Sequence, residues 1–239
     1  MKIDFNTRYN EKEFEALCQE AMRLGLDGLV MSGLNENRLL QYKSARVFPA
    51  QELEWVAALE HNNYRSLDDF EANKRASDMT KVYRGKLLAL LPSSKPFLVN
   101  PDNRLYPLLE QIKHNGGVSI ALQDDTNWPV TLTMSDRKKL YPFDAIRIRP
   151  YNIHDVNSEL QFAPVSVAGS GASDLNKGAY TVYEKPIQTQ EELIQAIKRR
   201  TKTELYVHNN GSSIRIENTV KPLKVVIDPK KIERLRRSI

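Results

Sequence analysis

Short apolar runs rich in valine, isoleucine and phenylalanine recur along the chain and predict a series of buried strands. These runs lie at residues 2–5, 28–31, 46–49, 96–99, 118–122, 144–149 and 164–169. Between several of them the apolar residues have helical spacing instead. The two clearest helical stripes are Phe14, Leu17, Cys18 and Ala21, and Leu105, Leu108, Leu109 and Ile112. Strand and helix therefore alternate, which favours parallel strands joined by right-handed crossovers, in a doubly wound sheet or a barrel.

Residues typical of helix ends support these boundaries. Asn10 followed by Glu13 resembles a capping box, and Gly25 stands where the first helix is expected to stop. Thr189 with Glu192 opens a late helix that ends in basic residues. No GxGxxG or GxxxxGK[ST] fingerprint is present, which weighs against dinucleotide-binding and P-loop folds.

The pattern changes after residue 202. Residues 204–209 and 212–217 alternate and flank Asn210-Gly211, a strong hairpin signal, and residues 223–228 form a possible third strand. We therefore predict a barrel over residues 1–202 and a small C-terminal hairpin appendage with a basic tail over residues 203–239.

The net charge of +5 is confined to the tail. Residues 221–239 hold seven lysines and arginines against Asp228 and Glu233, so the rest of the chain is neutral overall. The simplest interpretation is a solvated amphipathic helix, and the alternative is a contact with nucleic-acid phosphate, a membrane surface or an acidic partner. No apolar run approaches the roughly 20 residues of a membrane-spanning helix, so we expect a cytoplasmic protein. Because Cys18 is the single cysteine, no internal disulfide and no cysteine-built zinc site is expected.

Polar residues follow the predicted strands, where the C-terminal ends of parallel barrel strands carry the working residues. The candidate ligand-binding set is Asn6, Arg8, Glu52, Asn100, Arg147, Arg149, Ser170 and Ser173. No histidine belongs to it. Ser32, Ser170 and Ser173 are weak nucleophile candidates, because no histidine clearly faces them and no GxSxG elbow is present.

Several short segments resemble, in order, those of the polymerase and histidinol phosphatase (PHP) family. They are KIDFNTR (2–8), LGLDGLVMSGLN (24–35), VFPAQELEW (47–55), LVNP (98–101) and VAGSGAS (167–173). The resemblance implies an α/β fold, a distorted seven-stranded β/α (TIM-like) barrel. It also implies phosphoester hydrolysis with zinc, manganese or iron.

The chain departs from the family at most of the metal-ligand positions. Asn6 and Arg8 stand in place of the first histidine pair, and Asn100 in place of a later histidine. Gly33, Leu34, Gly171 and Ser173 replace the remaining aspartates and histidines, so that only Glu52 matches a ligand. Glycine and leucine supply no donor and arginine is a permanent cation, so we expect no metal cluster and no cofactor.

Arginines at or near the positions of the family's metal ligands suggest that guanidinium groups replace the positive charge of the metal ions. Arg147 and Arg149 are two residues apart and share one face of a strand. With Arg8, Asn6 and Asn100 they can form an anion clamp. In the alternative, the arginines pair with Glu52, Asp4 or neighbouring carboxylates and only fill the space.

These observations predict a metal-free, catalytically degenerate PHP-like protein that binds a phosphorylated small molecule or acts as a scaffold. One alternative is an active phosphoesterase with an atypical site, in which Asp124 or His154 serves as a weak candidate acid or base. Another alternative is a nucleic-acid-binding subunit that uses the basic C-terminal tail.

Overall fold

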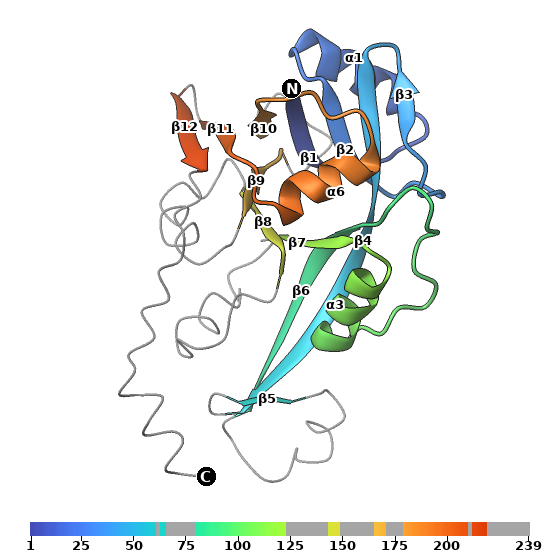
Figure 1. Ribbon diagram of the computed structural model, residues 1–239, viewed down its shortest axis with the longest axis vertical. Coiled ribbons are helices and arrows are strands. Elements are labelled where there is room, and N and C mark those ends of the chain that lie inside the picture. The colour runs from blue at the N-terminus through green and yellow to red at the C-terminus, as the bar shows by residue number, and fades with distance from the viewer. Residues whose placement is uncertain are drawn as a thin grey trace.

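The computed structural model describes residues 1–60, 63–65, 80–122, 143–148, 165–170, 179–209 and 212–218 (Figure 1). The helices of this described part are α1 (Phe14–Arg23), α3 (Leu105–His114) and α6 (Gln190–Lys198). Its strands are β1 (Lys2–Arg8), β2 (Gly28–Ser32), β3 (Leu40–Tyr42), β4 (Ala45–Glu60), β5 (Asn63–Arg65), β6 (Thr80–Leu90), β7 (Val118–Leu122), β8 (Ala145–Ile148), β9 (Ser166–Ala168), β10 (Ala179–Tyr183), β11 (Thr203–Asn209) and β12 (Ser212–Asn218).

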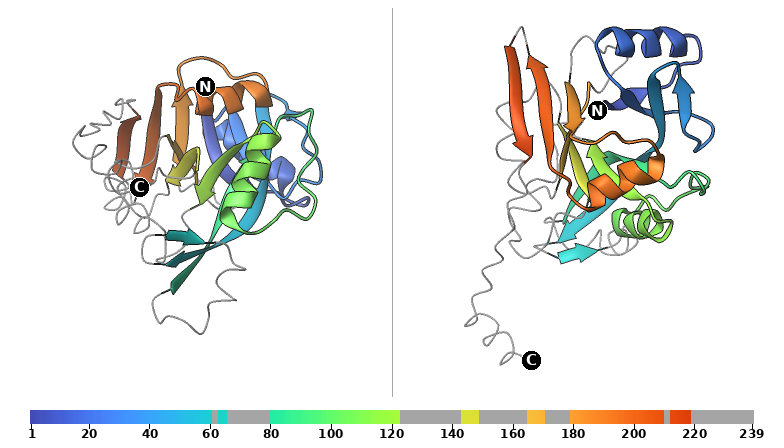
Figure 2. Two further views of the ribbon diagram at one scale, coloured as in Figure 1. Left: turned by 60° about the horizontal axis from the view of Figure 1, so that its bottom comes forward. Right: turned by 45° about the horizontal axis from the view of Figure 1, so that its top comes forward.

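All the strands belong to one mixed sheet. Its order is β12-β11-β10-β1-β2-β4-β6-β7-β8-β9, with β3 and β5 paired to β4 off this path. The strands β1, β2 and β4 run parallel, as do β7, β8 and β9, whereas β6 is antiparallel to both β4 and β7. The sheet curls into a nearly closed barrel, as the views in Figure 2 show.

The barrel closes where β9 approaches β1 and β10. Ala168 N donates to Thr181 Oγ1 at 2.8 Å, and Ser170 N donates to Asp4 Oδ1 at 2.9 Å. Gly169 lies between Ala168 and Ser170 in the sequence, and its backbone lies directly against the carbonyl of Phe5. We call this line of contacts the seam.

Three apolar clusters follow from the alternation of side chains across the sheet. The barrel interior holds Phe5, Val30, Phe48, Leu88 and Ile120, and α6 covers one of its ends with Leu193, Ile194 and Ile197. Outside the barrel, α1 packs Leu17, Cys18 and Ala21 against Leu29 and Met31. In the same way, α3 packs Leu105, Leu108 and Ile112 against Leu87 and Ala121.

The predicted distorted seven-stranded β/α (TIM-like) barrel is wrong. The described residues form a mostly-β barrel-like sheet with three helices, and its strands are mixed in direction. The main cause is β4, which continues to Glu60 and forms a ladder with β6 from the Gln51–Ala89 pair to the Glu60–Thr80 pair. A hairpin-like antiparallel ladder thus occupies the place where we expected a parallel crossover.

Pro49 explains why the length of β4 was missed. A proline is uncommon inside a strand, because it has no N–H to donate to the ladder. On one side of β4, β3 pairs as far as Val47 and β6 begins at Gln51, so Pro49 falls between the two ladders. Its carbonyl accepts a hydrogen bond from Gln190 Nε2 at 2.7 Å, which ties β4 to α6.

The strand predicted at residues 96–99 is also wrong. This segment does not belong to any strand of the described residues. The side chain of Gln51, in place of a neighbouring strand, forms hydrogen bonds with its backbone. Gln51 Nε2 donates to Leu98 O and Leu98 N donates to Gln51 Oε1, both at 2.9 Å. The amide side chain of Gln51 therefore forms the two hydrogen bonds that the N–H and carbonyl groups of Leu98 would otherwise form with a neighbouring strand.

The other predicted strands and helices lie where the apolar spacing put them. The six remaining runs overlap β1, β2, β4, β7, β8 and β9, and the three helical patterns correspond to α1, α3 and α6. Thr189 caps α6 by accepting a hydrogen bond from Glu192 N, as expected. The hairpin signal at residues 210–211 joins β11 and β12, which extend the same sheet through β10. The possible strand at 223–228 and the basic tail lie outside the described residues.

None of the helices in the described part of the chain is long and apolar enough to cross a membrane.

Candidate functional site

Charged side chains line the inside of the barrel at the end opposite α6. Paired residues of neighbouring strands share a face of the sheet. Lys86, Leu122 and Arg147 are in register across β6, β7 and β8, and Leu122 belongs to the interior cluster. Arg8 pairs with Ser32 at the ends of β1 and β2, and Glu52 of β4 pairs with Leu88. The alternation of side chains across the sheet therefore places Arg8, Glu52, Lys86 and Arg147 on the inner face of the barrel, and their positions along the strands place them near the same end.

Glu52 is the centre of this group. Its Oε1 accepts hydrogen bonds from Arg8 Nη2 at 2.8 Å and from Lys86 Nζ at 2.9 Å. Burial alone would raise the pKa of Glu52, but the hydrogen bonds from Lys86 and Arg8 and their charges outweigh burial and lower it. We call Arg8, Glu52 and Lys86 the Glu52 cluster.

Behind the cluster lie two buried charged groups, Arg147 and Asp4. Burial lowers the pKa of Arg147 to about 10, against the attraction of Asp4 and Glu52. Burial raises the pKa of Asp4 to about 7, and this effect is opposed by hydrogen bonding with Ser170 and by the charge of Arg147. Near neutral pH, Asp4 is therefore only partly ionised.

Among the described residues of this region, the positive charges outnumber the negative ones. Arg8, Lys86 and Arg147 carry three positive charges, whereas Glu52 supplies one full negative charge and Asp4 a partial one. The Arg8 side chain is 63% exposed and Lys86 is 33% exposed, while Glu52 is only 18% exposed. The region thus presents cationic donors to solvent around a partly buried carboxylate, an arrangement suited to an anion.

The structure brings together several of the predicted site residues. Arg8, Glu52 and Arg147 lie in this region, and Ser170 joins it through Asp4. Asn100 is exposed in a turn with φ 47°, and no contact between it and the Glu52 cluster is found among the described residues. Arg149, Ser173, Asp124 and His154 lie outside the described residues, as does the side chain of Asn6.

Two functional candidates were missed. Lys86 was not considered because its strand, β6, was not predicted, although residues 80–90 (TKVYRGKLLAL) end in a continuous apolar run, Leu87 to Leu90. Asp4 was considered only as a partner for the arginines. Its position inside a buried apolar strand, between Ile3 and Phe5, is the signal that distinguishes it from a surface carboxylate.

The residues present do not fit the metal centre that the PHP resemblance implies. Within the described ranges, no group of three or more histidine, cysteine, aspartate or glutamate side chains is arranged to hold a metal ion. Glu52 is already hydrogen bonded to two cations, which would repel a divalent ion.

A shallow hollow on the outside of α3 is a separate feature. It is lined by Pro107, Glu110, Gln111, Lys113, His114 and Asn115. None of the predicted site residues lines it.

No family model matches the chain, and a comparison with curated proteins finds no match. The case for any function therefore depends on the geometry described above.

Proposed function

We propose that the protein binds a small phosphorylated molecule at the Glu52 cluster. The observation that carries this proposal is the sharing of one carboxylate oxygen by two cations from different strands, Arg8 of β1 and Lys86 of β6. The single negative charge of Glu52 is thus shared by two positive charges. The buried Arg147 adds a third positive charge, which interacts electrostatically with Glu52. An incoming anion gains attraction from all three groups.

A phosphomonoester suits this arrangement better than a carboxylate does. It carries close to two negative charges near neutral pH and has three strong acceptor oxygens. The guanidinium of Arg8 offers a planar fork of N–H donors, and its exposure leaves the fork accessible to a phosphate. Lys86 supplies a second donor from the other side of Glu52.

The first test removes one cation. In a calorimetric titration with inorganic phosphate and phenyl phosphate at low ionic strength, Arg8→Ala is expected to weaken binding about tenfold, since a charge-assisted hydrogen bond contributes roughly 1.5–3 kcal/mol. Arg23→Ala is the matched control, because Arg23 is 64% exposed and also pairs with a carboxylate, that of Glu20. Equal affinities for wild type, Arg8→Ala and Arg23→Ala would reject the site.

The second test removes the shared carboxylate. Glu52→Gln keeps the size of the side chain but frees Arg8 and Lys86 from an anionic competitor, so the affinity for phosphate is expected to rise about tenfold. The same titration measures it, with Glu20→Gln as control. If the cluster only fills space, Glu52→Gln will leave the affinity for phosphate unchanged.

A further inference from the structure

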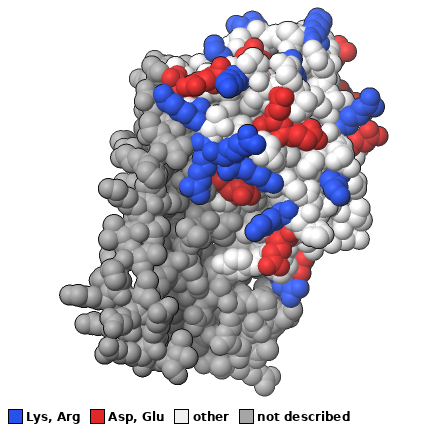
Figure 3. Space-filling view, in the orientation of Figure 1, with Lys and Arg blue, Asp and Glu red and all other residues white. Residues whose placement is uncertain are grey.

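A second group of cations lies on the outer surface, at the end of α6. Lys198, Arg199, Arg200 and Lys202 are all exposed, and we call them the α6 basic cluster. In Figure 3, lysine and arginine side chains gather over the end of α6 from which the chain turns toward β11. Lys198 Nζ donates to Gly116 O at 2.7 Å, so the exposed Lys113 at the end of α3 lies close by. This cluster is separate from the Glu52 cluster, since α6 covers the opposite end of the barrel.

In the described part of the chain, cations outnumber acidic side chains at this end of α6. Glu184 approaches Lys202 at 4.0 Å, but both side chains are more than half exposed and such a pair contributes little. The acidic residues of α6 are in its first turn, where Glu191 accepts hydrogen bonds from Ser93 and Glu192 accepts one from Gln188 N. Among the described residues, the C-terminal end of α6 therefore keeps a net positive charge, although Figure 3 shows acidic side chains beside it.

The backbone at Arg200 gives an independent reason to examine this cluster. All three helices end in a Schellman motif, in which the backbone N–H groups of the first two residues beyond the helix cap donate to carbonyls of the last turn. In each motif the first of these two residues has a positive φ. That residue is Gly25 after α1, with φ 70°, and Gly116 after α3, with φ 77°. After α6 it is Arg200, with φ 52°. A side chain is strained in this conformation and glycine is not, so the arginine is kept at a cost in stability.

We propose that the α6 basic cluster binds the phosphate backbone of a nucleic-acid duplex. Four cations within five residues match the closely spaced charges of two phosphate strands. The exposed large apolar residues of the described part, Val99 and Tyr106, are not in the cluster, so it lacks the apolar contacts of a membrane-binding surface.

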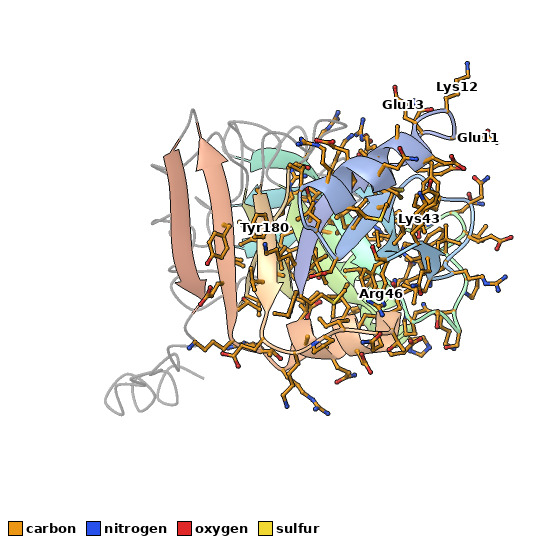
Figure 4. The ribbon with its side chains drawn as sticks, turned by 90° about the horizontal axis from the view of Figure 1, so that it is seen from above. Glu11, Lys12, Glu13, Lys43, Arg46 and Tyr180 are labelled. Atoms are coloured by element: carbon orange, nitrogen blue, oxygen red, sulfur yellow. The ribbon has the colours of Figure 1, made fainter. Side chains whose placement is uncertain are left out.

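Single-stranded nucleic acid is less suited to this surface, because it is held by stacking on free aromatic rings. Tyr180, labelled on β10 in Figure 4, already stacks on Tyr206 with ring centroids 5.1 Å apart. Lys2 Nζ lies 5.6 Å from the centroid of the Tyr180 ring, which also packs against the apolar cluster beneath α1. The α6 basic cluster itself consists of lysine and arginine, which suit contacts with phosphates.

Replacing Arg200 separates binding from stability. Arg200→Gly in the full chain is expected to raise Tm by about 3 °C, because it relieves strain at the end of α6. It is also expected to weaken binding to short RNA and DNA duplexes about threefold and to reduce the slope of log affinity against log salt by about 0.9. The double variant Arg199→Gln/Arg200→Gly is expected to reduce that slope by about 1.8. Fluorescence anisotropy at several salt concentrations measures both quantities.

The exposed Arg38, which lies outside the cluster, provides the control Arg38→Gln. This variant is expected to bind duplexes like the wild type. An unchanged affinity and salt slope in the double variant would overturn the proposal, even if Tm rises. It would also be overturned if wild type bound phosphatidylserine-containing vesicles but neither duplex, since the surface would then contact a membrane. Preference for RNA or DNA in the wild type identifies the kind of duplex.

Discussion

Gly169→Ala is expected to open the barrel and to cost at least about 4 kcal/mol of the free energy of unfolding, among the largest effects of a single substitution. A methyl group at this position would lie 1.6 Å from Phe5 O and 2.5 Å from the carbonyl carbon. Both are backbone atoms of a buried strand and have no room to move. The effect arises from space alone, because Gly169 is not among the glycines with positive φ in the described part.

Urea denaturation followed by tryptophan fluorescence measures this loss. Gly28→Ala is the matched control, since Gly28 is also in a buried strand but the nearest atom to its methyl group would be in the ring of Phe48, at 3.0 Å, with Arg46 O and Met1 Cε at 3.4 Å. We expect the control to cost no more than about 1–3 kcal/mol, as for ordinary overpacking. Similar stabilities for Gly169→Ala and wild type would show that β9 does not close against β1. If the alanine variant fails to fold, Gly169→Ser should fail as well while Gly28→Ala folds.

The buried carboxyl of Asp4 is expected to make the protein less stable as the pH rises through neutrality. Its pKa is about 7 in the folded protein against 3.8 for the free side chain, so between these values the folded state binds more protons than the unfolded state. The stabilisation from this group is therefore complete below about pH 4 and is lost progressively up to about pH 7. A few kcal/mol are involved, because one pKa unit corresponds to about 1.4 kcal/mol.

The measurement compares the free energies of unfolding of wild type and Asp4→Asn from pH 4 to pH 8. The wild type should lose stability relative to Asp4→Asn across this range. Asp144→Asn is the control, because the Asp144 carboxylate also accepts a serine backbone N–H, from Ser119 at 2.8 Å, but the residue is exposed. A constant difference between wild type and Asp4→Asn would mean that Asp4 stays ionised in the folded protein.

Local structure followed from the sequence because each element depends on its own residues. The periodic apolar residues of α1 and α3 placed both helices, and the continuous apolar runs placed β2 and β7. Strand direction is different, since it depends on which distant segment pairs with which. A proline at residue 49 concealed the long ladder between β4 and β6, and the antiparallel β6 changed the fold class.

The site was predicted in part for the same reason. Arg8 and Arg147 lie near the ends of strands that the sequence locates, and Glu52 follows an apolar run that it also locates, so their meeting could be anticipated. Lys86 depends on β6, and the burial of Asp4 depends on the approach of β9, so neither role was visible in the local pattern. The resemblance to the PHP family pointed to Arg8, Glu52 and Ser170, which lie in the region of the Glu52 cluster, but it implied the wrong barrel.

The seam between β9 and β1 differs from the rest of the barrel wall in how it is held. Two side chains, those of Asp4 and Thr181, accept the backbone N–H groups there, whereas the neighbouring strands share regular ladders. Such a junction can separate locally without the cooperative loss of a ladder. Local opening of the barrel is therefore expected to begin at the seam. Such an opening would expose the interior to solvent without displacing α6.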